Sequence, residues 1–197
     1  ISARAASNKV FPVRVTPGVN RAYQKGTLDK DGKLVNATAA AGMTIYRGEN
    51  FPESFNGSGF VTEPAGNLLK VINIERGADN KVKGAFHYNG KDFLASTDEW
   101  FRPVNVYTAP DGSLWMIDMY FGLLQHKAYL TSYLRKQYAS RNLDKPMPNN
   151  GRLYRIRYTK NPLNKAVKLS GKSVEELVPF LSHKNGTVRD TAQRLLV

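Results

Sequence analysis

The same strand pattern occurs twice in the chain, and this internal repeat constrains the fold more than any other sequence feature. The first block, FVTEPAGNLLKVINI, has an apolar strand that ends in Glu63, followed by Gly66 and a second strand. The second block, LWMIDMY, contains Asp118 and is followed later by GRLYRIRY, with residues 121–150 inserted between its two strands. Without this insertion, GNLLKV aligns with GRLYRI.

Short runs rich in β-branched and aromatic residues recur over residues 37–158, separated by turn residues, and each run is typical of a strand. A candidate inner strand precedes each block, at residues 37–46 and 102–109. Sheets of about four antiparallel strands repeated in this way are typical of the blades of a β-propeller. The sequence therefore predicts a mainly β chain with about two four-stranded blades of a propeller over residues 1–160. Two blades cannot close a ring, so further blades are expected outside this sequence.

A helix is expected within the insertion, because apolar residues recur there at spacings of three and four. These residues are Leu130, Tyr133, Leu134 and Tyr138. A basic linker follows the last strand over residues 161–172.

The strand pattern ends before residue 173, and the sequence of residues 173–197 predicts two short helices. Ser173 can cap the first helix, and Glu175 and Glu176 in its first turn suit the positive end of the helix dipole. After a break at HKNGT, apolar residues mark a second amphipathic helix. They are Val188, Ala192, Leu195 and Leu196. The pattern resembles the first unit of a HEAT-repeat array, which needs stacked neighbours to bury its apolar faces.

The composition excludes several kinds of site. The chain has no cysteine, which rules out disulfides, thiolate zinc sites, thiol nucleophiles and a C-x-x-C-H haem attachment within these residues. The formal charge of +13 would favour an anionic partner if it lay on one face. Much of it lies in residues 151–172, where it alternates with apolar residues as on a solvated strand. Since no nucleic-acid-binding motif accompanies it, no nucleic acid partner is expected.

Three runs together resemble the C-terminal blades of the soluble quinoprotein sugar dehydrogenase-like propellers. They are STDEWFRPVNVYTAPDGSLWMIDMYFGLLQH, YRGENFPESFNGSGFVTEPAGNLLK and the closing GRLYRI. The resemblance covers roughly residues 10–197. It is closest to large bacterial membrane-bound dehydrogenases, in which HEAT repeats, and often a cytochrome c domain, follow the propeller.

This resemblance implies an exported protein of the bacterial periplasm or cell envelope that oxidises a sugar or another alcohol. The implied cofactors are pyrroloquinoline quinone (PQQ), which accepts a hydride, and Ca²⁺, which polarises the quinone. Electrons would pass to a haem c domain or another envelope protein outside this chain, within a complex that can be membrane-associated. The family's principal base histidine belongs to an early blade, which also lies outside this chain.

The resemblance points first to residues near the inner strand at 102–109. Arg102 corresponds to the family's cofactor-facing arginines, and Asp98 and Glu99 are candidate substrate-binding residues. An alternative for Arg102 is a structural ion pair with Asp98 or Glu99.

In the turn between the strands of the first block, Asn67 is a candidate cofactor ligand and Glu63 a candidate substrate ligand. The family carries a quinone-facing lysine in this turn, whereas this sequence has Ala65 and Gly66. One expected cation is therefore missing. A satisfied turn, with Asn67 bonded to nearby backbone, explains these residues equally well.

Three further candidates lie at or after the end of the second block. Asp118 is the candidate metal ligand, Tyr120 a candidate cofactor contact, and His126 on the insertion a candidate acid or base. Alternatively, Asp118 pairs with backbone N–H groups and ties blade to blade. A second hypothesis for the whole chain is non-catalytic: a propeller with HEAT repeats that serves as an interaction scaffold in a cell-envelope complex.

Overall fold

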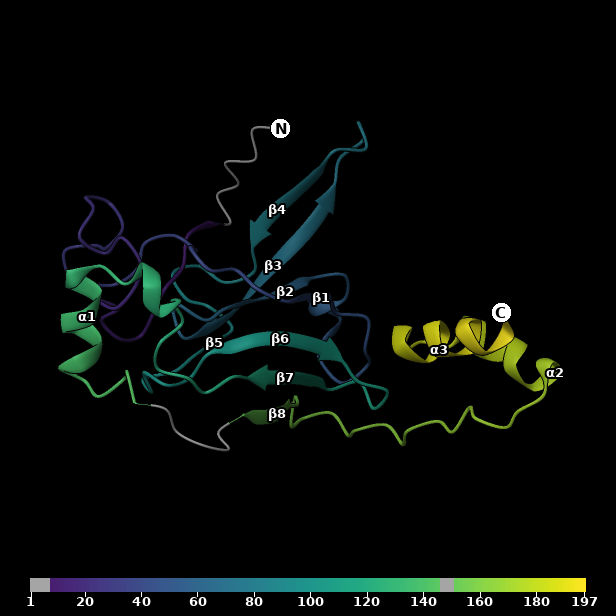
Figure 1. Cartoon of the computed structure of the whole chain (residues 1–197). Coiled ribbons are helices and arrows are strands. Elements are labelled where there is room, and N and C mark those ends of the chain that lie inside the picture. The colour runs from purple at the N-terminus through teal and green to yellow at the C-terminus, as the bar shows by residue number, and fades with distance from the viewer. Residues whose placement is uncertain (1–7, 146–150) are drawn as a thin grey trace.

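Two antiparallel sheets form the centre of the computed structural model, which describes residues 8–145 and 151–197 (Figure 1). Sheet 1 has the order β1 (Met43–Ile45), β2 (Gly59–Glu63), β3 (Leu68–Arg76) and β4 (Val82–Phe86), and β5 (Leu94–Ala95) also pairs with β3. Sheet 2 has the order β6 (Pro103–Thr108), β7 (Leu114–Asp118) and β8 (Arg152–Ile156). The predicted mainly antiparallel β character is confirmed. Within the described residues sheet 2 has three strands, one fewer than the sequence suggests.

The helices are short and lie outside the sheets. They are η2 (Glu53–Phe55), η3 (Lys127–Tyr129) and α1 (Ser132–Ala139), then α2 (Val174–Leu177), η4 (Val178–Ser182) and α3 (Gly186–Leu196). The helix expected within the insertion is α1, and Leu134 and Tyr138 on it are buried as predicted. Ser173 caps α2 in a capping box with Glu176, also as expected. None of the described helices is long and apolar enough to cross a membrane.

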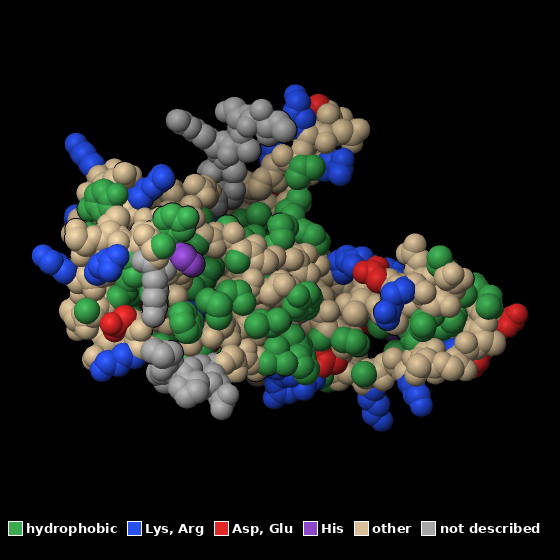
Figure 2. Space-filling model, viewed as in Figure 1, with side chains coloured by type: hydrophobic (Ala, Val, Ile, Leu, Met, Phe, Trp, Pro, Cys, Tyr) green, Lys and Arg blue, Asp and Glu red, His purple; other side chains and the backbone are tan. Residues whose placement is uncertain are grey.

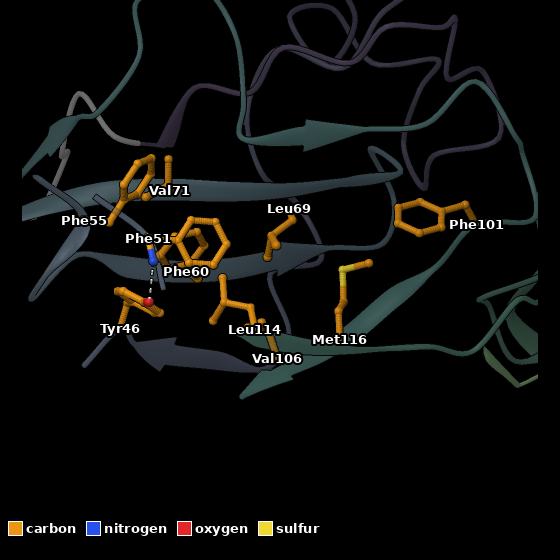
Figure 3. Packing of buried hydrophobic residues seen from close by; sticks show 10 residues of the cluster. All are labelled: Tyr46, Phe51, Phe55, Phe60, Leu69, Val71, Phe101, Val106, Leu114 and Met116. Carbon is orange, nitrogen blue, oxygen red and sulfur yellow. Dashed lines mark hydrogen bonds between the residues drawn. The ribbon is translucent and has the colours of Figure 1, made fainter. Parts of the chain in front are cut away.

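One aromatic-rich core joins the two sheets. Tyr46, directly after β1, and Phe60 of β2 pack with Val106, Leu114 and Met116 from sheet 2 in a single buried cluster (Figure 3). The edge-to-face ring pairs in this cluster, such as Tyr46 with Phe60 at 6.0 Å between centroids, are favourable aromatic geometries. Because the cluster draws on both sheets, neither sheet buries this face without the other.

The Tyr46 hydroxyl is the polar link inside this core. It donates to the carbonyl oxygen of Gly112 at 2.7 Å and accepts from the amide of Asn50 at 3.0 Å. It also accepts from the amide of Phe51 at 2.9 Å, the bond drawn in Figure 3. Gly112 lies in the predicted Pro-Asp-Gly turn, where its φ of +84° suits glycine. The hydroxyl thus ties the loop after β1 to the turn between β6 and β7.

The two blocks of the repeat correspond through their acids. Glu63 pairs across its sheet with Leu68, and Asp118 pairs with Arg152. Matching Glu63 to Asp118 therefore matches Leu68 to Arg152, whereas the alignment of GNLLKV with GRLYRI pairs Arg152 with Asn67. The two alignments differ by one residue, and a slip of one residue turns every side chain to the other face of the sheet.

The hydrogen bonds of the acids decide between these alignments. The Glu63 carboxylate accepts from the amide of Ala39 at 3.1 and 3.2 Å, shortly before β1. The Asp118 carboxylate accepts from the amide of Arg102 at 2.7 Å, just before β6. The two acids make the same connection in their blocks, which favours matching Glu63 to Asp118 and so shifts the alignment of GNLLKV with GRLYRI by one residue.

Residues 8–39 cover the second face of sheet 1. Val10, Val19 and Leu34 pack there with Ala65 and Leu68 in a second buried cluster. Isolated bridges, such as that between Lys9 and Asn36, are the strand-like pairs in this segment. The face of sheet 2 that points away from the shared core has no equivalent cover within the described residues.

Candidate functional site

A cavity of about 490 Å³ lies between the N-terminal segment and the insertion, at the strand ends of both sheets. Its wall includes Arg14 and Arg21 from the N-terminal segment, Glu99 and Arg102 from the approach to β6, and Tyr138 from α1. This volume falls within the range of ~300–1,000 Å³ that is usual for small-molecule sites. The cavity is therefore large enough for an organic ligand.

Arg102 holds three parts of the chain together at the cavity wall. Its side chain is almost fully buried, and Nη1 donates to the carbonyl oxygen of Pro64 at 2.8 Å. Nε donates to the carbonyl of Phe121 at 3.1 Å, and Nη2 donates to that of Gly122 at 3.1 Å. The guanidinium thus joins the β2–β3 turn and the start of the insertion to the start of β6.

The charge of Arg102 has no carboxylate partner among the described residues. Burial lowers the pKa of Arg102 to about 10, so the guanidinium remains charged at neutral pH. The two acids predicted as alternative partners pair elsewhere: Asp98 lies 4.0 Å from Arg152, and Glu99 lies 2.8 Å from Arg14. All direct hydrogen bonds of its guanidinium go to backbone carbonyls, and its positive charge leaves the wall attractive to an anion.

Glu99 is shared between two arginines. Its Oε1 atom pairs with Arg14 and also accepts a short hydrogen bond from Arg141, which lies behind the wall. Arg14 in turn donates to the Oδ1 atom of Asn67 at 3.0 Å. Glu99 therefore positions the arginines, and its own charge is already compensated.

Asn67 is fully buried and takes part in the turn between β2 and β3. Its φ of +56° lies in the left-handed region, which asparagine tolerates better than most residues. Its Nδ2 atom donates to the carbonyl of Phe101 at 2.6 Å. The Asn67 side chain therefore bonds to the backbone before β6 rather than to its own turn, and it reaches the cavity through its bond to Arg14.

Glu63 lies behind the cavity wall. Burial raises the pKa of the Glu63 carboxyl, and the backbone amides of Ala39, Thr38, Ala65 and Gly66 partly oppose this shift. Three of these residues, Thr38, Ala39 and Ala65, line the cavity themselves. The structure thus places Glu63 close to the cavity, with its carboxylate directed at backbone amides.

Asp118 is completely buried, and its Oδ1 atom accepts from the amides of Arg102 at 2.7 Å and Tyr120 at 2.8 Å. Its Oδ2 atom has no hydrogen-bond partner among the described residues. Ca²⁺ takes about 6–8 oxygen ligands. No group of three or more His, Asp or Glu side chains placed to hold a metal occurs in the described part of the chain. The residues described do not by themselves fit a calcium site.

Asp98 and Tyr120 belong to a separate surface cluster. The guanidinium of Arg152 lies 3.3 Å from the centroid of the Tyr120 ring and 4.0 Å from the Asp98 carboxylate. The ring of Trp100 lies 6.1 Å from that of Tyr120. Neither Asp98 nor Tyr120 lines the cavity. Asp98 and Tyr120 are therefore separate from the predicted site residues at the cavity.

His126 is exposed on the insertion. Its Nδ1 atom accepts from the amide of Ala128 at 3.4 Å, and its ring lies 5.6 Å from that of Tyr129. Its chain neighbours Leu124 and Gln125 line the cavity, but His126 does not. Its role as an acid or base stays a prediction.

Sequence reasoning missed Arg14, Arg21 and Arg141. Arg14 and Arg21 lie in a segment without a helix or strand period, so nothing in the local pattern marks them. The excess of basic over acidic residues in the chain was the only sequence feature that pointed to them. Arg141 follows α1 and could be placed only once Tyr138 and Tyr133, whose hydroxyls donate to Gly18 and Pro17, had fixed α1 against the N-terminal segment.

Residues 1–160 match a family described as a domain of unknown function, DUF7133. No curated protein and no solved structure matches the chain. The matched region contains all eight strands of the two sheets and every residue that lines the cavity. Since the match extends over most of the sequence, the chain belongs to the DUF7133 family.

Proposed function

We propose that the chain is part of a quinoprotein-type dehydrogenase propeller and supplies an arginine-lined wall for its anionic cofactor. One observation carries this proposal. Arg14, Arg21 and Arg102 line the cavity, while Glu99 is the one carboxylate of the wall within the described residues and is already shared by Arg14 and Arg141. Arg21 and Arg102 are therefore available to a negatively charged ligand.

The arrangement of the sheets supports the propeller. With Glu63 matched to Asp118, Phe60 corresponds to Trp115 and Leu69 to Leu153. Phe60 and Leu69 face sheet 2, whereas Trp115 and Leu153 face away from sheet 1. The two sheets are therefore stacked in the same sense, as successive blades of a ring are, rather than with equivalent faces together as in a symmetric sandwich. In the same proposal, α2, η4 and α3 form the first HEAT-like unit after the blades.

The arginines of the cavity wall suit the carboxylate groups of PQQ. PQQ carries three carboxylates, and when bound it accepts the hydride from the alcohol carbon. Arg21 and Arg102 would hold carboxylates by charge-assisted hydrogen bonds, for which the planar guanidinium is well matched, while Arg14 stays paired with Glu99. The residues described do not fit the metal, and His126 remains the candidate acid or base of this chain beside a principal base in an earlier blade. In this proposal the chain binds and orients the cofactor, and the rest of the protein supplies the principal base.

Arg21 offers the cleanest test, because it is exposed at the rim of the cavity and makes no ion pair within the described residues. Arg21→Gln should weaken PQQ binding, measured by calorimetry on the complete protein, and lower dye-linked oxidation of a panel of sugars and alcohols. Arg76→Gln, which removes an exposed arginine at the end of β3, is the matched control and should change neither. Absence of both PQQ uptake and oxidation in the wild-type protein would end the enzymatic proposal.

A second candidate, the non-catalytic scaffold, is favoured by how Arg102 is used. All three of its guanidinium nitrogens donate to backbone carbonyls, so its role in holding the fold together is complete without a ligand. On this candidate the wild-type protein takes up no PQQ. Deletion of residues 173–197 from the complete protein would then abolish capture of its envelope partner while leaving the sheets folded.

A further inference from the structure

The face of sheet 2 turned away from the shared core exposes four large apolar side chains, beside the polar Arg155 and Asn105. The side chains of Tyr107, Trp115, Ile117 and Leu153 are 50%, 37%, 39% and 58% exposed. Tyr107 is directly opposite Trp115, and Ile117 is directly opposite Leu153, so the four lie together on one side of the sheet. Figure 2 shows hydrophobic side chains gathered over β6 and β7 on the face turned to the viewer.

The strand β7 is apolar on both of its faces. Leu114 and Met116 point into the shared core and are 0% and 1% exposed, while Trp115 and Ile117 alternate with them on the open side. A strand with one wet face normally alternates apolar and polar residues, and a continuous apolar run is typical of a strand covered on both faces. The sequence of β7 is thus that of a strand in an inner layer.

We infer that a third antiparallel sheet, a further copy of the repeat within the same protein, packs on this open face. The inference deepens the proposed propeller and rests on it. The interface between sheets 1 and 2 supplies the argument, because Phe60 and Leu69 correspond to Trp115 and Leu153 when the acids are matched. Two residues on the open face of sheet 2, Trp115 and Leu153, therefore correspond to residues by which sheet 1 already docks on its neighbour, while Arg155 corresponds to Val71.

The established interface also defines the chemistry of the partner. Sheet 2 presents mainly aliphatic or thioether side chains to sheet 1, with one tyrosine among them. They are Val106, Leu114, Met116, Ile156 and Tyr154, and they meet Phe60, Leu69 and Val71 of sheet 1. The open face of sheet 2 carries two aromatic residues, Tyr107 and Trp115. It suits a partner sheet whose facing residues are of the Val, Leu and Met type. A second copy related by a two-fold axis would instead place Trp115 against its own face, without this complement.

Oxidative footprinting of aromatic side chains in the complete protein tests the inference. Labelling of Trp115 and Tyr107 in the native protein is compared with labelling after unfolding in urea. Both residues should lose most of their labelling in the native state. Tyr129 and Tyr23, which are 73% and 57% exposed on other surfaces, serve as internal references and should keep theirs.

Trp115 labelled as fully as Tyr129 would overturn the inference, and so would protection that disappears on dilution, which would reveal a second copy on this face.

A variant pair gives an independent measurement. Ile117→Lys should lower the melting temperature of the complete protein, whereas Ile74→Lys, at a β3 residue that is 37% exposed, should leave it nearly unchanged. Equal melting temperatures for the two variants would count against the third sheet. Loss of PQQ binding alone would leave the footprint intact, so failure of the cofactor proposal is distinguishable.

Discussion

Sheet 1 and sheet 2 share one core but differ in what lies on their other faces. On sheet 1, residues 8–39 bury Leu68 completely, whereas on sheet 2 Trp115 and Leu153 remain exposed. The strand patterns of the two sheets are alike, so the difference comes from the neighbouring layer. A repeated strand unit of this kind is complete only when a layer covers each face.

The sheets also differ in the connection after their acids. Four residues, 64–67, join β2 to β3, whereas residues 119–151 join β7 to β8. The longer connection brings α1 against the N-terminal segment, and the cavity lies between them. The candidate site therefore arises where the two copies of the repeat are least alike.

The largest expected effect comes from breaking the shared core. Phe60→Ala removes a fully buried ring that contacts both sheets, and it should cost about 3–5 kcal/mol of unfolding free energy. Urea unfolding followed by tryptophan fluorescence measures this change, and the two native tryptophans, Trp100 and Trp115, both lie outside sheet 1. Because the core is shared, destabilisation that starts in sheet 1 should shift their signal as well. An unchanged fluorescence transition would show that the sheets unfold separately.

A smaller effect is expected from Tyr46→Phe, which keeps the ring and removes only the hydroxyl. The carbonyl of Gly112 and the amides of Asn50 and Phe51 then lose a buried partner. A cost of about 1–3 kcal/mol is usual when a buried polar group loses its hydrogen-bond partner. Thermal unfolding measures it. Tyr158→Phe, at a half-buried tyrosine on the edge of the same cluster, is the control and should cost much less.

Much of this comparison could be read from the sequence, because the strand signals are local. Alternation, β-branched residues and the Pro-Asp-Gly turn located β2, β3, β6, β7 and β8 closely. The sequence could not show how the two blocks align. Matching Gly66 to Gly151 and matching Glu63 to Asp118 agree with the sequence equally well. Only the hydrogen bonds of Glu63 and Asp118 to backbone amides before the inner strands separate the two alignments.

The candidate site was predictable only in part, because only some of its residues lie next to a local strand signal. Arg102 and Glu99 lie next to a strong strand signal, and both line the cavity. Arg14 and Arg21 come from a segment whose conformation depends on tertiary contacts, such as the bond from the Lys70 ammonium group to the Lys9 carbonyl. Contacts between residues so distant in the chain leave no periodic trace in the sequence.

Glu63 provides a prediction based on pH. Burial raises the pKa of its carboxyl above the ordinary value of 4.5, so the folded protein holds this proton more tightly than the unfolded chain does. Its contribution to stability is then fully present below pH 4.5 and is lost as the pH rises through the folded pKa. Glu63→Gln should remove this part of the pH dependence, measured as the urea midpoint from mildly acidic to neutral pH.

The matched control for Glu63→Gln is Glu75→Gln, at an exposed acid on β3 in the same sheet. This variant should keep the pH dependence of the wild-type protein. If Glu63→Gln and wild-type midpoints fall in parallel as the pH rises, the buried carboxyl is not the source of the dependence.

The smallest change in unfolding free energy is expected for a substitution at Leu153. This substitution tests the difference between sheets 1 and 2 most directly. Leu153→Ala should change the unfolding free energy of residues 1–197 by less than about 0.5 kcal/mol, because its side chain is 58% exposed. Leu69→Ala, at the corresponding position of sheet 1, removes a side chain with no exposure and should cost about 2–5 kcal/mol. Urea unfolding of both variants gives the difference directly.

In the complete protein the third sheet would bury Leu153, so the cost of Leu153→Ala should rise toward that of Leu69→Ala. If the two costs stay as far apart in the complete protein as in residues 1–197, the open face of sheet 2 is a true surface and the two halves of the repeat are different in kind.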